Sequence, residues 1–365
     1  MSLKNYHVDT PALLLDLEAA DRNIQRMSNY FKGRKACLRP HVKVHKSPFL
    51  AHKQIQAGAI GITCAKTSEA EVMAYSGIDD ILIANEVVGE DKLRRLARLA
   101  KTCKIQVAVD DFENGKQLSL AASQEDSKIG VLVEVNLSSD LDGIIDRCGV
   151  YAGAPAVELS RQVSQLRNIE FKGLMGYEGG LRKFHEFAER KVAVEKALGR
   201  LVETKDMVED VGLNVGMVSC GGTRSYNIAG EFPGVTEVQA GSYIFMDASY
   251  QKFGLDFELS LTLLTSIVSR PRLDKAIIDA GLKAISADSG LPIVKDQPEL
   301  ECTGLNAEHG HLRVVKPDAD ARQGDLLELV STHVDTTVVL HDNYVLTLRG
   351  ENVGNLNIAG RGKLQ

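Results

Sequence analysis

The sequence lacks any apolar run of membrane-spanning length, and its N-terminus has no apolar signal-peptide core. It also lacks a basic tract or a basic patch interleaved with aromatic residues. Its 43 Lys and Arg against 49 Asp and Glu give a mild net charge of −6. We therefore expect neither a membrane nor a nucleic-acid partner, and we predict a soluble protein.

Cysteine pairs of the CxxC type are also missing. The six cysteines are scattered, and most lie in or beside apolar runs, where we expect small buried hydrophobic residues in a reducing compartment. This distribution predicts a cytoplasmic protein. A hydrophobic content of 44% over 365 residues predicts a sizeable core, enough for a large α/β domain and a smaller second one.

Short apolar runs alternate with amphipathic helical patterns through the first two thirds of the chain. After an apolar strand at 10–16 and a helix at 17–31, the predicted strands are 35–43, 59–65, 80–84, 105–109, 130–136, 171–175, 217–220 and 236–239. The helical patterns are 48–57, 67–76, 90–101, 111–122, 154–166 and 184–211, with a shorter one after Arg224. Eight strands alternating with helices predict a parallel sheet, and eight is the number that closes a barrel. An open doubly wound sheet is disfavoured because no early strand is followed by a Gly-x-Gly-x-x-Gly turn.

After about Phe253 the pattern changes to β-type runs separated by turn residues. These runs are 259–268, 275–279, 312–315, 326–330, 336–340 and 344–349. We predict an α/β protein with a (β/α)8 TIM-type barrel over residues 1–252 and a mostly β C-terminal domain over 253–365. The first 15 or so residues lie outside the eight-strand count and could pair with the second domain. Residues 357–365 are predicted to form a loose tail.

The segment Arg39-Pro40-His41-Val42-Lys43-Val44-His45-Lys46 ends the first predicted barrel strand. Because side chains alternate along a strand, we expect His41, Lys43 and His45 on one face and Lys46 on the other. A lysine beside two histidines inside a fold has the chemistry of a Schiff-base nucleophile. A solvated basic loop that binds an anion is the alternative, and this segment alone does not decide between them.

The residues after the predicted strands carry most of the reactive side chains, as expected at the active-site end of a barrel. They are Lys43, Asn136, Arg147, Tyr177, Ser219 to Thr223 and Gln239 to Tyr243. The Ser-Cys-Gly-Gly-Thr turn suits a phosphate, because two glycines let the backbone amides approach an anion closely. The seventh and eighth strands are where barrels commonly hold phosphate. A lysine at the first strand together with this turn suggests pyridoxal 5′-phosphate.

Several segments match one family from end to end of the chain. They are Arg39 to Lys46, Thr10-Pro11-Ala12-Leu13, Asp146-Arg147-Cys148-Gly149-Val150, Cys220-Gly221-Gly222-Thr223, Thr236 to Tyr243 and Glu308-His309-Gly310-His311. With these segments the sequence resembles the fold-type III pyridoxal-phosphate enzymes related to D-threonine aldolase and D-serine dehydratase, distant relatives of alanine racemase. The resemblance implies a barrel plus a β-domain, usually as a homodimer.

The resemblance also implies roles for individual residues. Lys43 would be the Schiff-base lysine, Arg147 would lie near the cofactor's phenolic oxygen, and Tyr177 near its ring or phosphate. Gly222 and Thr223 together with Gly241 and Ser242 would lie around the phosphate. Gly221 and Tyr243 are further cofactor-binding candidates, although Tyr243 could equally be a packing residue. Gln239 takes the place where alanine racemases put an arginine facing the pyridine nitrogen, which argues against simple racemisation. His41 and His185 are the remaining catalytic candidates; His41 could equally orient the site, and His185 could be a surface residue.

His333 and Asp335 are two positions apart, which on a strand would place an imidazole and a carboxylate on one face. On spacing alone such a pair is mostly structural. In the family that the sequence resembles, this place carries a metal pair, and the dehydratases typically have cysteine as the second ligand. Asp335 therefore favours Mn²⁺ or Mg²⁺ over Zn²⁺ and indicates the aldolase branch.

We predict a metal-assisted pyridoxal-phosphate lyase that cleaves D-3-hydroxy amino acids to glycine and an aldehyde. The first alternative is a dehydratase of D-serine or D-3-hydroxyaspartate, which would release a 2-oxo acid and ammonia. An amino-acid racemase is a weaker alternative. A non-catalytic pyridoxal-phosphate carrier would lack both the metal pair and the second domain.

Overall fold

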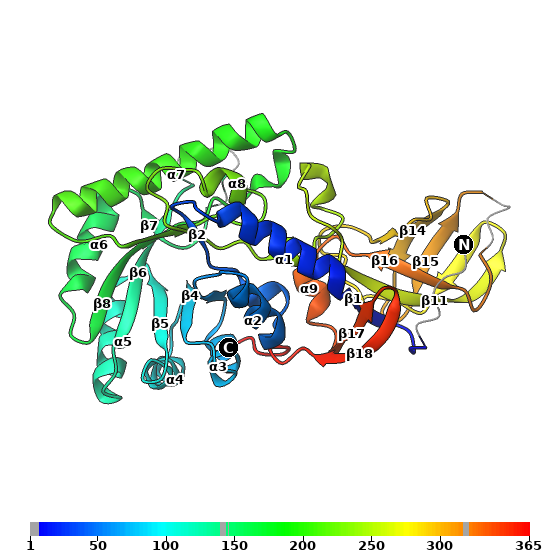
Figure 1. Ribbon diagram of the computed structural model, residues 1–365, viewed down its shortest axis with the longest axis horizontal. Helices are drawn as coiled ribbons and strands as arrows, with labels where there is room; N and C mark the ends of the chain where they lie inside the picture. Colours follow the sequence, from blue (N-terminus) through cyan, green and yellow to red (C-terminus); the bar gives the residue numbers. More distant parts are fainter. Residues whose placement is uncertain (1–6, 139–143, 145, 317–320) are drawn as a thin grey trace. The chain divides into compact units, whose positions relative to one another are not determined.

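The computed structural model describes residues 7–138, 144, 146–316 and 321–365. The chain divides into two compact units. The barrel unit comprises Met27–Gly241 and Lys363–Gln365, and the β unit comprises Met1–Arg26 and Ser242–Gly362. Helix α1 (Leu17–Phe31) begins in the β unit and ends in the barrel unit (Figure 1).

The barrel unit is built on one sheet of parallel strands in the order β2-β10-β9-β8-β6-β5-β4-β3. A parallel bridge between His41 and Thr63 joins the two edges, so the predicted TIM-type barrel is confirmed. The strands are β2 (Cys37–Leu38), β3 (Ile62–Cys64), β4 (Asp80–Glu86), β5 (Lys104–Val109), β6 (Ile129–Asn136), β8 (Ile169–Met175), β9 (Met217–Cys220) and β10 (Glu237–Val238), with β7 (Val150–Tyr151) beside β6.

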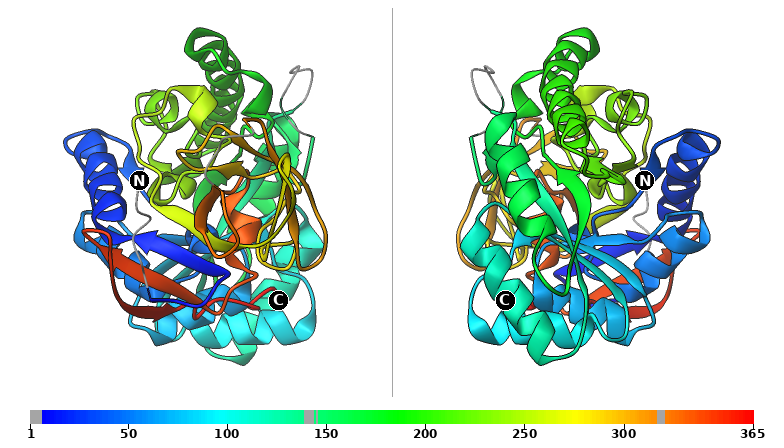
Figure 2. Two further views of the ribbon diagram at one scale, coloured as in Figure 1. Left: turned by 90° about the vertical axis from the view of Figure 1, so that its right-hand side faces the viewer. Right: turned by 90° about the vertical axis from the view of Figure 1, so that its left-hand side faces the viewer.

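Helices follow the strands and lie on the outside of the sheet, as the two end-on views make clear (Figure 2). They are α2 (Pro48–Gln56), α3 (Thr67–Tyr75), α4 (Glu90–Leu99), α5 (Phe112–Gln124), α6 (Ala154–Ser164), α7 (Phe187–Asp210) and α8 (Tyr226–Ala229), with short 3₁₀ turns η1 (Val42–Val44) and η2 (Leu181–Lys183). Apart from one or two terminal residues and the later start of α7, these are the predicted helices. No helix in the described ranges is long and apolar enough to cross a membrane.

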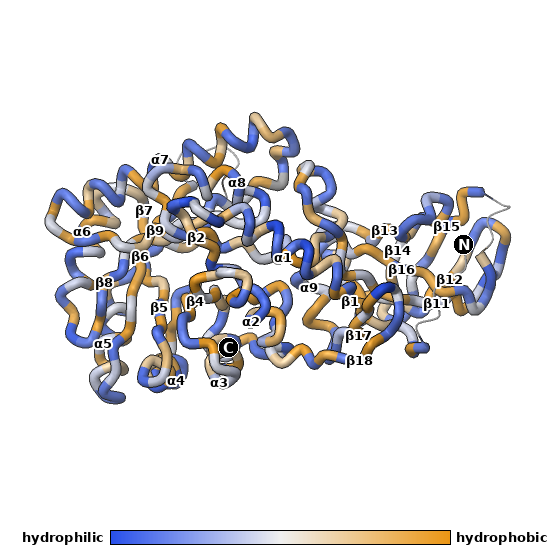
Figure 3. Tube along the Cα trace, in the orientation of Figure 1, coloured by the Kyte–Doolittle hydropathy of each residue, from blue (hydrophilic) through white to orange (hydrophobic). Residues whose placement is uncertain are grey.

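The barrel core follows from strand alternation. Leu82, Ala108, Leu132 and Met175 come from four neighbouring strands and pack into one buried cluster. Apolar stretches mark the middle of strands such as β5 and β6, whereas the helices alternate apolar and polar positions (Figure 3). The strand bodies therefore supply stability, and the residues that follow the strands remain for chemistry.

A buried arginine holds the first strand in place. Arg39 is 4% exposed; its Nε lies 3.0 Å from Glu237 Oε2, and its Nη1 lies 2.6 Å from Asp80 Oδ1. These partners lie in β10 and β4, so the ion pairs connect strands on both sides of the barrel closure. Glu237 is itself buried, and the carboxylate depends on Arg39 for its counter-charge.

The β unit contains a second sheet in the order β14-β15-β12-β11-β1-β17-β18, with β16 paired to β11 and β13. Its core includes Ala12, Leu14, Leu264 and Val345. The strands are β1 (Ala12–Asp16), β11 (Leu261–Arg272), β12 (Lys275–Ile278), β13 (Ile293–Val294), β14 (Leu300–Leu305), β15 (Gly310–Val314), β16 (Leu326–Val330), β17 (Asn343–Leu348) and β18 (Glu351–Asn357). The N-terminal strand β1 pairs with β11 and β17, although residues 1–6 lie outside the described part of the chain.

Two predictions for this unit are wrong. The run 336–340, predicted as a strand, instead forms the end of a short helix, α9 (Val334–Val338), and a turn, and Asp247 holds the helix start through the Val334 amide. The predicted loose tail, 357–365, is held in place: Asn357 ends β18, and the Ile358 amide donates to the Asp342 carbonyl at 2.8 Å. In the barrel unit, Gln365 exchanges hydrogen bonds with Ser68, through Ser68 N to Gln365 O at 2.8 Å.

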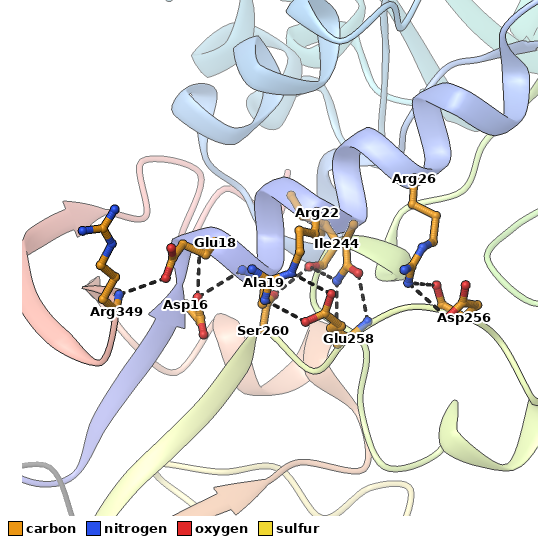
Figure 4. A network of polar contacts seen from close by, with 11 residues as sticks. Asp16, Glu18, Ala19, Arg22, Arg26, Ile244, Asp256, Glu258, Ser260 and Arg349 are labelled. Atoms are coloured by element: carbon orange, nitrogen blue, oxygen red, sulfur yellow. Dashed lines mark hydrogen bonds and ion pairs between the residues drawn. The ribbon is translucent and has the colours of Figure 1, made fainter.

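The start of helix α1 is fixed by polar contacts within the β unit (Figure 4). Asp16 Oδ1 caps the helix by accepting hydrogen bonds from the amides of Glu18 and Ala19, both at 3.0 Å. Further along the helix, Arg22 makes a bidentate contact with Glu258 at 2.8 and 2.7 Å. These contacts connect the helix to the segment that leads into β11.

Replacing Arg39 with Met should leave the buried Glu237 carboxylate without a counter-charge. We expect a loss of about 3–5 kcal/mol in the free energy of unfolding, measured by urea titration of the far-ultraviolet circular dichroism. Adding Glu237→Gln should restore part of that loss. As a control, Arg161→Met removes an exposed ion pair with Glu158 and should leave the midpoint unchanged. An Arg39→Met variant that unfolds like the wild type would contradict the assignment.

Candidate active site

Lys43 lies on the 3₁₀ turn η1 directly after the first barrel strand, and its side chain is exposed. The prediction that 35–43 is one strand is wrong, because only Cys37–Leu38 forms a ladder and the chain then turns at Val42. The alternating-face argument for His41, Lys43 and His45 therefore fails. Burial separates the residues instead, since His45 and Lys46 are buried while Lys43 is not.

Lys46 is held by a buried ion pair with Glu69, which is fully buried in helix α3. Glu69 also accepts hydrogen bonds from the amides of Ala65 and Lys66, at 2.7 and 3.2 Å. Breaking the ion pair would leave a charge buried without its partner. Lys46 therefore has a structural role in this arrangement.

Both histidines of this segment are held through their rings. The Nδ1 atom of His41 accepts a hydrogen bond from the Lys43 amide at 3.4 Å. Burial and the nearby Lys43 charge hold the pKa of His41 well below its usual value, although a hydrogen bond to the Thr63 backbone opposes this. His45 is contacted by the Ser47 amide at 3.1 Å and by Gln54 at 3.2 Å, and its burial lowers its pKa to about 4. His41 and His45 are therefore neutral and fixed by hydrogen bonds to their rings. Such imidazoles are better suited to orienting the backbone than to acting as a general acid or base.

Arg147 and Tyr177 come together at the ends of two neighbouring strands, with the guanidinium carbon 5.4 Å from the ring centroid. The loop that carries Arg147 is attached to β6 through Asn136. The Nδ2 atom of Asn136 donates to the Arg147 carbonyl at 2.5 Å and to Asp146 Oδ1 at 2.8 Å. Tyr177 is 40% exposed. A Cβ atom at Gly222 would lie 3.5 Å from Cε2 of Tyr177, so this ring also faces the glycine turn.

The turn Cys220-Gly221-Gly222-Thr223 is organised by Glu178, a carboxyl group that the sequence analysis did not select. Glu178 is fully buried, and it accepts hydrogen bonds from the Gly221 amide at 3.2 Å and from the Ser225 hydroxyl. Ser225 Oγ in turn accepts from the Gly222 amide at 3.1 Å. Burial raises the pKa of Glu178 above its usual value. Two amides of the turn are therefore used to fix its own shape.

Gln239 and Gly241 lie next to the lysine segment. The Gln239 amide group donates to Ser219 Oγ at 2.8 Å. A Cβ atom at Gly241 would lie 2.6 Å from the His41 carbonyl oxygen, so only glycine permits this approach. Ser242 and Tyr243 belong to the β unit, in the 3₁₀ turn η3 (Ser242–Ile244), where Tyr243 is fully buried with its ring 5.6 Å from that of Phe257.

His185 lies between η2 and α7, and its side chain is exposed. Its carbonyl accepts a hydrogen bond from Nη1 of the buried Arg190 at 2.8 Å. The segment is therefore anchored through its backbone while the imidazole faces solvent in the barrel unit. A catalytic role for His185 stays a prediction.

His333 and Asp335 lie in the β unit, but not on a strand as predicted. His333 is the N-terminal cap residue of α9 and Asp335 is in its first turn. Asp288, which the sequence analysis missed, contacts His333 Nδ1 through its Oδ2 at 2.6 Å. Burial opposes its ionisation, but hydrogen bonds from His333 and Ser286 hold the pKa of Asp288 below its usual value. Because the Asp288 carboxylate contacts Nδ1 of His333, Nε2 is the ring atom that would bind a metal. A carboxylate on the other ring nitrogen is common for histidines that bind metals.

The α9 helix is anchored by a buried carboxylate. Asp247 is 2% exposed, and its Oδ2 accepts from the Val334 amide at 3.2 Å. Its Oδ1 accepts from the amides of Ser249 and Tyr250, at 2.9 and 3.2 Å. The backbone between His333 and Asp335 is thus fixed from within the β unit.

Comparisons with known proteins identify the family. Residues 15–249 match the alanine racemase N-terminal domain, and residues 260–347 match a putative serine dehydratase domain. D-threonine aldolase of Arthrobacter sp. is 38% identical over 97% of this chain and 93% of its own length. The 3-hydroxy-D-aspartate aldolase of Paracoccus denitrificans strain Pd 1222 is 36% identical over 98% and 93%. The crystal structure of D-threonine aldolase from Filomicrobium marinum superposes with a TM-score of 0.94 at 36% identity, covering 99% of this chain and 98% of that one.

The chain belongs to the alanine racemase-like family that includes the D-threonine aldolases. The resemblance inferred from sequence is therefore confirmed. Aldolases are lyases, so the prediction of an enzyme of this class is confirmed as well. The structure brings Arg147, Tyr177 and the glycine turn together in the barrel unit, and it shows that Asp288 supports His333.

Gly221 and Gly222 should differ in their tolerance of a side chain. Gly221 has a φ of +79°, and a Cβ there would lie 2.9 Å from Val238 Cγ1, whereas a Cβ at Gly222 makes only ordinary contacts. Gly221→Ala should cost roughly 1–2 kcal/mol for the left-handed backbone alone and weaken cofactor binding by deforming the turn. Gly222→Ala is the matched control and should bind the cofactor nearly as the wild type does. Equal affinities in a pyridoxal-phosphate titration would contradict this account of the turn.

Proposed function

We propose that this enzyme is a metal-assisted, pyridoxal phosphate-dependent lyase that cleaves D-3-hydroxy amino acids to glycine and an aldehyde. The observation that carries the proposal is the set of groups at the carboxyl ends of the barrel strands. An exposed Lys43 follows β2, and Arg147 and Tyr177 meet beside the glycine turn after β9. The aldolase relatives, which align with nearly the whole chain, support the same reading.

The residues present fit pyridoxal phosphate. Lys43 would hold the cofactor's aldehyde carbon, Arg147 would face its phenolic oxygen, and the turn at Gly222 and Thr223 would hold its phosphate. When bound, the cofactor supplies the electron sink for bond cleavage at the substrate's α-carbon. Tyr177 would cover the ring, since its own ring already faces both Arg147 and Gly222. His41 would orient the lysine turn through its contact with the Lys43 amide.

The donor set in the β unit fits a divalent metal. His333 and Asp335 would hold it, and Asp288 would fix the imidazole from its other nitrogen. An imidazole and a carboxylate suit Mn²⁺ or Mg²⁺, and Zn²⁺ is a further possibility. The metal would supply a Lewis acid that makes the substrate's β-hydroxyl more acidic. The homodimer and the cytoplasmic location remain predictions.

The second candidate function is dehydration. D-threo-3-hydroxyaspartate dehydratase of Delftia sp. is 29% identical over 86% of this chain, which is further away than the aldolases. One assay separates the two. The metal-loaded enzyme is incubated with D-threonine, D-3-hydroxyaspartate and D-serine, and the products are identified. Glycine and an aldehyde support the lyase, whereas a 2-oxo acid and ammonia as the main products would replace it with the dehydratase.

Lys43 and Lys46 should differ in their effect on the bound cofactor. We expect Lys43→Ala to abolish the visible absorption of the lysine-bound cofactor, because the amine that carries it is gone. Lys46→Met breaks only the buried ion pair with Glu69, so that absorption should survive in whatever fraction folds. The spectra are compared at equal amounts of folded protein. The reverse pattern would assign the cofactor to Lys46.

Removal of the metal should stop turnover without releasing the cofactor, because the two are held by different residues. Chelation is expected to leave the cofactor spectrum intact and to end aldehyde release, which Mn²⁺ should restore. Asp288→Asn should lower Mn²⁺ affinity by about 10- to 100-fold, as loss of a residue that orients a ligating histidine commonly does. Asp274→Asn, an exposed carboxylate paired with Arg272, is the control. Full activity of a verified metal-free sample would exclude the metal-assisted reaction.

A further inference from the structure

Three side chains converge in the barrel unit that the proposed function does not use. Glu86 ends β4, Glu134 lies in β6, and Cys148 comes just before β7. Their ligand atoms all lie within 4.8 Å of one another. Within the described part of the chain, this is the group of three His, Cys, Asp or Glu side chains with the spacing that a metal ion requires.

The carboxylates of this cluster are incompletely satisfied. Glu134 is 2% exposed, and its Oε1 accepts a hydrogen bond from Cys148 Sγ at 3.2 Å. Its Oε2 atom is buried and has no hydrogen-bond partner, and the same is true of Glu86 Oε1. A buried carboxylate oxygen without a partner is costly. The Glu86 and Glu134 carboxyl groups also lie within hydrogen-bonding reach of each other, so a proton shared between them, or a cation in its place, would satisfy these two atoms.

We propose that Glu86, Glu134 and Cys148 form a binding site for a divalent cation of the zinc class, in addition to the His333 and Asp335 pair. A thiolate with two carboxylates is a donor set for zinc or cadmium, whereas magnesium and manganese prefer oxygen alone. The ionised set would carry three negative charges and a divalent cation two positive ones. The remaining charge would face Arg147, whose Nη2 lies 3.7 Å from Cys148 Sγ.

Without the cation, protons take its place. Burial and the neighbouring Glu86 raise the pKa of Glu134 to about 7, and burial and Glu134 raise the pKa of the Cys148 thiol to about 11. The cation must displace these protons, so its affinity should increase with pH.

The test uses the full-length protein, stripped of metal and free of pyridoxal phosphate, with Cd²⁺ as the zinc-class probe. Thiolate coordination gives Cd²⁺ a charge-transfer absorption in the ultraviolet, which oxygen and imidazole ligands do not produce. We expect this band to reach the amplitude of one thiolate-bound Cd²⁺ per chain in the wild type, to vanish in Cys148→Ser and to require more Cd²⁺ in Glu134→Gln. Cys103→Ser, a half-buried thiol bonded to the Leu99 carbonyl, and Glu125→Gln are matched controls that should keep it.

Absence of the band in folded wild-type protein at saturating Cd²⁺ would overturn the proposal, and so would an unchanged band in Cys148→Ser. If the variants do not fold, the proposal can be tested on the wild type by measuring how fast iodoacetamide alkylates its cysteines. Zn²⁺ should protect Cys148 from iodoacetamide while Cys103 reacts at an unchanged rate, and unprotected Cys148 would overturn the site. The experiment involves neither cofactor nor turnover, so its failure is distinguishable from a failure of the proposed lyase.

Discussion

The closure of the barrel beside Pro40 is the constraint on which the candidate site depends. Thr63 donates its amide to the Pro40 carbonyl at 2.9 Å, while Arg39 donates to Val238 on the other side at 3.0 Å. Proline has no amide hydrogen to offer in return, so the contact with β3 is a single bridge instead of a ladder. The chain leaves the sheet immediately afterwards and turns at Val42, which puts Lys43 in solvent at the strand end. The lysine is exposed because the closing strand is short.

Carboxylates buried beneath the functional loops recur in this molecule. Glu69 binds the backbone of the loop after β3, Glu178 the glycine turn after β9, and Asp247 the start of α9. Each one satisfies amides that would otherwise be free at a strand or helix end. Such groups fix a loop without filling the space above it with apolar side chains. Lys43 remains exposed, and so does Tyr177, which precedes Glu178 in the sequence.

The sequence predicted the elements with strong periodicity and missed those decided by tertiary contacts. Helix α1 was predicted at its exact bounds, because its apolar pattern and the Asp16 cap are local. The prediction of a strand over 35–43 was wrong, because the closure of the barrel and Pro40 limit the length of this strand, whereas the prediction rested on local propensity. The run 336–340 was predicted as a strand because Val and Thr favour strands. A hydrogen bond from the Val334 amide to Asp247, 87 residues away, instead holds the start of the helix at 334–338.

The site residues divide in the same way. Lys43, Arg147 and the glycine turn were found from sequence because they follow apolar strands at the end where barrels carry chemistry. Asp288 was missed, because a single Asp in a loop carries no sign of the histidine that it contacts 45 residues later. Glu134 was also missed, because it is the one carboxylate in the otherwise apolar strand β6. The sequence does not show that Glu86 and Cys148 lie beside it. A residue at the end of a strand can be recognised from the local sequence. Contacts between side chains that are distant in the sequence can be known only from the fold.

The two halves of the proposed chemistry are built independently. Lys43 is positioned by His41, Pro40 and Thr63, which all belong to the barrel unit, and His333 and Asp335 by Asp247 and Asp288, which belong to the β unit. A substitution in one set should therefore spare the ligand held by the other. Loss of activity through the metal set with the cofactor retained would reflect this division of the chain, since the contacts named above for each set lie within one unit.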